Sequence, residues 1–145
     1  MNISRLAVLF CIVLSGCGGG GGGGDDVESF VGRWTGRMEA LDDFCVALGF
    51  GDFNFAMTVN QDGTDVVVDS DSGDTFVGTV TGPKLDVFKT QPSSCTSGSG
   101  QLTTQIVLTK LDGSETRGIG VLQIKSSCGN AELSCEFVAD MTRTS

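Results

Sequence analysis

Residues 53–59 read Phe-Asn-Phe-Ala-Met-Thr-Val, the clearest strand pattern in the chain. Large apolar side chains at 53, 55, 57 and 59 alternate with smaller or polar ones. A period of two is typical of a β-strand with one face in a core and the other in water. Residues 75–81 repeat the pattern, with Phe76, Gly78 and Val80 on one face. Both stretches predict antiparallel strands.

Similar strand signals cover most of the chain after residue 30, and turn residues such as Gln61-Asp62-Gly63 and Gly82-Pro83 separate them. Residues 91–100 are rich in Ser and Gly and predict a loop. Residues 41–49 predict a short helix, capped by Asp42 or Asp43 and ended by Gly49. The predicted strands are 30–38, 53–59, 64–68, 75–81, 84–89, 102–110, 116–124 and 135–142.

No helical run is long enough for parallel crossovers, so consecutive strands are expected to pair antiparallel. About eight such strands can close into a barrel, which removes exposed sheet edges. The sequence therefore predicts an all-β fold, an up-and-down antiparallel barrel with one short helix between strands 1 and 2. A β-sandwich is the alternative.

Residues 1–16 have the form of a signal peptide, with Arg5 followed by a wholly apolar run over 6–14. As a helix this run rises only about 14 Å, too short for a bilayer core of about 30 Å. Leu14-Ser15-Gly16-Cys17 follows directly. It resembles the lipobox of bacterial lipoproteins, which implies cleavage before Cys17 and lipidation of its thiol. The alternative is an ordinary signal peptide followed by a chance cysteine.

The residues after Cys17 form a tether. Residues 18–24 are seven consecutive glycines, which have no preferred conformation. Fully extended, a stretch of this length reaches about 25 Å. We expect residues 17–29 to be the lipidated cysteine and its tether, and residues 30–145 to be the barrel domain. In Gram-negative lipoproteins an aspartate after the cysteine marks inner-membrane retention. Gly18 stands there instead, so the resemblance implies the outer membrane.

The charge of the chain disfavours two kinds of partner. The formal net charge is −9, and it becomes −10 when Arg5 is lost with the leader. An acidic surface repels phosphate backbones and anionic headgroups, which disfavours nucleic-acid binding and charge-driven adsorption to membranes. The expected contact with the membrane is the lipid anchor alone.

Four cysteines remain in the domain: Cys45, Cys95, Cys128 and Cys135. Export would place them in an oxidising compartment, where an even number favours two disulfides. We expect Cys128 to bond Cys135 across a hairpin turn, which leaves Cys45 to bond Cys95. Zinc is the competing use, but the chain has no Cys-x-x-Cys pair and no histidine.

The absence of histidine removes the common nucleophilic triads and most zinc hydrolysis. A pair of aspartates for glycoside hydrolysis remains open, although most aspartates lie in predicted turns. Residues 69–74, Asp-Ser-Asp-Ser-Gly-Asp, differ in residue order from an EF-hand calcium loop and favour a polar turn. We expect no enzyme activity, metal or cofactor.

Gly32-Arg33-Trp34 opens the first strand of the predicted meander and resembles the Gly-x-Trp motif of lipocalin-type (calycin) barrels. The resemblance implies that Trp34 lies across the closed end of the barrel. A basic residue from the last strand would pack on its ring, and Arg143 is placed to do so. It also implies that the loop over residues 40–51 covers the barrel mouth.

Two non-enzymatic functions remain. A barrel filled by large side chains would be a structural or interaction module that meets another envelope protein. A barrel with room left by Gly78, Gly118 and Gly120 would bind a small apolar ligand. We favour the filled barrel, with these side chains as its candidate filling: Phe53, Phe55, Met57, Phe76, Phe88, Ile106, Leu108 and Phe137.

Overall fold

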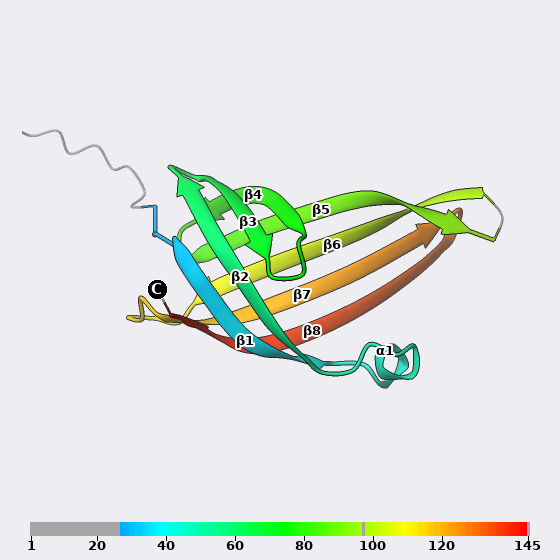
Figure 1. Cartoon of the computed structure of the whole chain (residues 1–145), viewed down its shortest axis with the longest axis horizontal. Coiled ribbons are helices and arrows are strands. Elements are labelled where there is room, and N and C mark those ends of the chain that lie inside the picture. Colours follow the sequence, from blue (N-terminus) through cyan, green and yellow to red (C-terminus); the bar gives the residue numbers. More distant parts are fainter. Residues whose placement is uncertain (1–26, 97, 145) are drawn as a thin grey trace, which may run out of the picture.

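The structure is a computed structural model that describes residues 27–96 and 98–144 (Figure 1). Each strand pairs antiparallel with the next, and β8 pairs with β1, so the sheet closes into a barrel. The predicted eight-stranded barrel with one short helix between strands 1 and 2 is confirmed. Its elements are β1 (Gly32–Ala40), α1 (Asp43–Ala47), β2 (Phe53–Asp62), β3 (Asp65–Ser70), β4 (Thr75–Thr81), β5 (Lys84–Cys95), β6 (Gly98–Lys110), β7 (Arg117–Cys128) and β8 (Ala131–Arg143).

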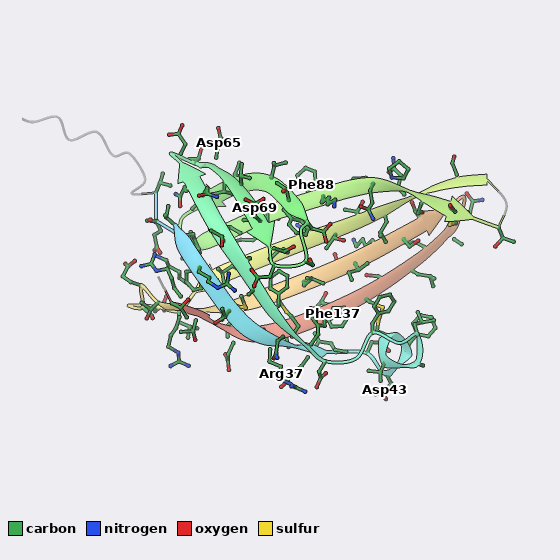
Figure 2. All side chains as sticks on the ribbon, in the orientation of Figure 1. Arg37, Asp43, Asp65, Asp69, Phe88 and Phe137 are labelled. Carbon is green, nitrogen blue, oxygen red and sulfur yellow. A yellow bond between two sulfur atoms is a disulfide. The ribbon has the colours of Figure 1, made fainter. Side chains whose placement is uncertain are left out.

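Alternation along the strands places one set of side chains inside the barrel, where they form a single core. Trp34, Met57 and Phe137 are among the largest buried side chains. Phe88 was expected in this core, and that prediction is wrong. Its neighbours Leu85 and Val87 point inward, and Phe88 lies on the outer face (Figure 2).

Atoms of adjacent strands lie directly beside the inward-facing glycines. A Cβ atom on Gly78 would lie 2.0 Å from the carbonyl oxygen of Asp86. A Cβ atom on Gly120 would lie 2.7 Å from the Cγ atom of Met141. These glycines therefore allow strands and side chains to approach closely, and the space a Cβ atom would need is already occupied.

The strands differ in length, and this makes the two ends of the barrel unlike. Pairing of β5 with β4 stops at Phe88, and pairing of β8 with β1 begins at Phe137. Beyond these points β5 to β8 continue as a four-stranded extension (Figure 1). The predicted loop over residues 91–100 is wrong, because most of it belongs to the paired strands β5 and β6. Its Ser-rich composition suits a sheet segment that leaves the core.

The predicted disulfide pairing is also wrong. Cys45 bonds Cys135, and Cys95 bonds Cys128. β8 begins at Ala131, directly after a tight turn, so Cys128 pairs with Ala131 and Ile124 pairs with Cys135. Cys128 and Cys135 therefore lie four residue pairs apart along the ladder, about 14 Å at 3.4 Å per residue, beyond the reach of a disulfide.

α1 is a single turn of helix beside β8 (Figure 1). The side chain of Asp42 caps it by accepting a hydrogen bond of 2.8 Å from the backbone N–H of Phe44. Cys45 is the buried residue of the helix, and its disulfide ties α1 to β8. The expected link between this segment and the region near residue 95 is therefore replaced by a link to the last strand.

Candidate functional site

The barrel has a closed end and an open end, and the open end contains a recess of about 230 Å³. Its lining comes from β2, the β3–β4 turn, and the inner faces of β4, β6 and β7. We call it the mouth recess; it is lined by Phe53, Asn54, Phe55, Ala56, Ser70, Asp71, Ser72, Asp74, Phe76, Thr104, Leu122 and Ile124.

Aromatic rings form the apolar part of the mouth recess. The ring of Phe53 meets that of Phe55 edge-on at 6.4 Å between centroids, and that of Phe137 at 5.3 Å. Such edge-to-face contacts hold the rings in defined positions. Phe53 and Phe55 are partly buried and pack on the core below them. The recess is therefore a preformed, largely apolar cup above the buried core.

The two carboxylates of the recess are paired with basic side chains. Asp74 pairs with Lys89, and the hydrogen bond from Lys89 lowers the pKa of the Asp74 carboxyl. Arg33 donates to Asp71 at 2.9 Å, and this hydrogen bond lowers the pKa of Asp71. Both carboxylates are thus held ionised in pairs. A general acid at neutral pH needs a raised carboxyl pKa, and the recess supplies the opposite shift.

The closed end is sealed by stacked side chains. The indole N–H of Trp34 donates to the carbonyl oxygen of Phe30 at 2.8 Å, and both residues are fully buried. The guanidinium carbon of Arg143 lies 5.8 Å from the centre of the Trp34 ring. Trp34 and Arg143 also face each other in the pairing of β1 with β8.

Lys110, a second cation at the closed end, was not predicted from the sequence. Lys110 is almost fully buried, and its ammonium lies 5.2 Å from the Phe30 ring centre. It pairs with Glu115 at 2.8 Å and with Glu28 at 3.3 Å. The hydrogen bond from Lys110 lowers the pKa of Glu115. Lys110 continues the inward alternation of Ile106 and Leu108, so a cation at a core-facing position was the available signal.

A cluster of exposed apolar residues around α1 was not predicted from the sequence either. We call it the α1 surface and define it as Leu41, Phe44, Val46, Leu48 and Phe50. The signal in the sequence was five large apolar side chains within ten positions of a segment predicted as one short helix, which can bury only one of its faces.

The remaining predictions concern sites for metal and for lipid. Across residues 27–96 and 98–144, no group of three or more acidic or cysteine side chains could hold a metal ion. The turn at residues 69–74 is a polar hairpin turn, in which the Ser70 and Ser72 hydroxyls lie 2.7 Å apart. The predicted signal peptide, Cys17 and most of the predicted tether lie outside the described residues. In the part of the chain that is described, no helix is long and apolar enough to span a membrane.

A scan against protein-family models and searches of curated proteins and solved structures found no match to this chain.

The contact of Arg143 with Trp34 can be tested through fluorescence, because Trp34 is the single tryptophan. Arg143→Ala removes a cation from the indole face. We expect it to shift the Trp34 emission and to lower the free energy of unfolding by at least about 0.5 kcal/mol. Urea unfolding followed by this emission measures both effects. Arg117→Ala, at an exposed arginine on β7, is the matched control. An unchanged emission and urea midpoint in Arg143→Ala would contradict a closing role.

Proposed function

We propose that this chain is an exported bacterial lipoprotein, cut before Cys17, lipidated on that cysteine and held at the outer membrane. The support is the apolar leader that ends in Leu14-Ser15-Gly16-Cys17. Two or three acyl chains would give stable anchoring, since each buried methylene contributes about 0.8 kcal/mol.

Hydrogen bonds hold the first residues that the structure describes against the closed end of the barrel. This is the arrangement expected where a tether joins the domain. Arg143 donates to the carbonyl oxygens of Ser29 and Val31, at 3.2 and 3.3 Å. Gln61 donates to the carbonyl oxygen of Glu28 at 3.0 Å. An anchored chain would therefore hold the barrel by its closed end, and the open end would be free to turn away from the membrane.

We propose further that the barrel is a non-enzymatic interaction module that meets another envelope component through its open end. The observation that carries this proposal is the α1 surface. Exposed apolar clusters on folded domains mark binding surfaces, since burial of such side chains in a complex is favourable. α1 lies far from the residues that follow the tether (Figure 1), so this surface would stay accessible when the chain is anchored.

The mouth recess favours a second candidate function, the binding of a small apolar ligand. Its volume of about 230 Å³ lies below the usual range for ligand pockets, about 300–1,000 Å³. A recess of this size suits one ring or a short alkyl group. Such a ligand would rest on Phe53 and Phe55 and would leave the ion pairs at the rim intact.

The lipid anchor is tested by Cys17→Ser in the producing bacterium. The serine hydroxyl does not replace the thiol as lipid acceptor, so unprocessed precursor should accumulate and labelled palmitate should not be incorporated. Cys11→Ser, within the leader, is the control and should be processed normally. Palmitate in the Cys17→Ser protein would remove the proposed anchor.

The interaction function is tested by photo-crosslinking of the lipidated full chain in its own envelope. A photoreactive benzoylphenylalanine at position 46, on the α1 surface, should give a discrete protein adduct. The same group at position 77, an equally exposed valine on the outer face of β4, should give none. Absence of adducts from position 46, or equal adducts from both positions, would reject interaction through α1.

The ligand function is tested with the neutral fluorescent probe N-phenyl-1-naphthylamine. Thr104→Trp places a large ring in the mouth recess and should abolish enhancement of the probe fluorescence. Thr103→Trp, one residue away, points to the outer face and serves as the control. Equal enhancement in both variants would place the probe outside the recess, for instance on the α1 surface, and would contradict the ligand function.

A further inference from the structure

The α1 surface does not hold α1 in place. Its five residues are each 45–59% exposed, and they lie within ten consecutive positions. The helix is secured by the disulfide between Cys45 and Cys135 and by the cap from Asp42. The exposed parts of these side chains make no contact that holds the segment. Their exposure to water is unfavourable unless another molecule covers them.

Several carboxylates lie close in sequence to these apolar side chains. Between positions 38 and 53 the sequence contains Glu39, Asp42, Asp43 and Asp52, and no Lys or Arg. Asp52 is paired with Arg37 at 3.5 Å. Asp43 lies in the first turn of α1 and projects away from the barrel (Figure 2).

We call Glu39, Asp42, Asp43 and Asp52 the acidic rim. Its negative charge favours some of the molecules that could cover the α1 surface and disfavours others. A second copy of the chain would bring the same carboxylates against its own, in a protein of net charge −9. An anionic lipid surface would meet the same repulsion. Like charges that are brought together at an interface oppose association, whereas opposite charges favour it and fix its orientation.

We propose that the α1 surface binds a basic amphipathic segment of another protein, in which a row of apolar side chains is flanked by Lys or Arg. The apolar side chains of the segment cover Phe44, Val46 and their neighbours. Its cations face Asp43 and the other carboxylates of the rim. This inference rests on the proposed interaction function and specifies the chemistry of its partner.

The proposal is tested on the lipidated full chain in nanodiscs of zwitterionic lipid. The probe is a short fluorescent peptide of Leu and Lys at helical spacing, and its counterpart carries Glu in place of Lys. Fluorescence anisotropy should show binding of the Leu/Lys peptide, weakening as salt rises because the charges are screened. The Leu/Glu peptide should bind at least about tenfold more weakly.

Matched variants locate the binding. Phe44→Ser with Val46→Ser should weaken binding of the Leu/Lys peptide at least about tenfold, through loss of apolar contact area. Val77→Ser with Phe88→Ser removes equally exposed apolar residues, at 52% and 51%, from the barrel wall and should leave binding unchanged. Asp43→Asn should reduce the salt dependence. Asp42 is left intact because it caps the helix.

Three results would overturn the proposal: equal binding of both peptides, equal loss in the control double variant, or binding of phosphatidylethanolamine vesicles without binding of the Leu/Lys peptide. The crosslinking experiment at position 46 shows whether only the basic partner is wrong or whether the proposed interaction function is wrong as well. Adducts in the envelope without peptide binding would retain the interaction function and reject the basic partner. Absence of adducts would reject both.

Discussion

Hydrogen bonds between β1 and β8 turn a twisted sheet into a barrel, and the core, the closed end and the open end all depend on this closure. At this seam the two strands approach closely. A Cβ atom on Gly36 would lie 2.5 Å from the sulfur of Met141 and 2.7 Å from the carbonyl oxygen of Asp140. A larger residue at position 36 would force the seam apart. Closure also leaves the short strands without free edges, which protects them from pairing with other chains.

Unequal strand length then divides the barrel into two chemically different halves. The closed half is filled by apolar side chains and sealed by Arg143 and Lys110, two cations that lie against aromatic rings. The open half carries the mouth recess, the polar extension of β5 to β8, and α1 on its disulfide. Residues that stabilise the fold are thus concentrated at one end, and surfaces able to bind other molecules at the other.

Local patterns predicted a large part of this arrangement. Alternation placed Phe53, Phe55 and Phe76 on inner faces, and each of them lines the mouth recess. The recess itself was not predictable, because Thr104, Leu122 and Ile124 reach it only through pairing of distant strands. The Ser-rich stretch over residues 91–100 misled because Ser and Gly favour loops, whereas here cross-strand pairing and the Cys95–Cys128 disulfide hold them in a sheet.

The all-β class, the number and order of the strands, and the short helix between the first two could all be predicted from the sequence. These features follow from period-two alternation and from turn residues, which act over a few neighbouring positions. Three features could not be predicted and depend on how distant segments pack: which cysteines bond, which strands extend beyond the barrel, and which apolar residues remain exposed around α1. These depend on register, and a turn that ends four residues earlier than expected brings Cys135 beside Ile124 instead of Cys128.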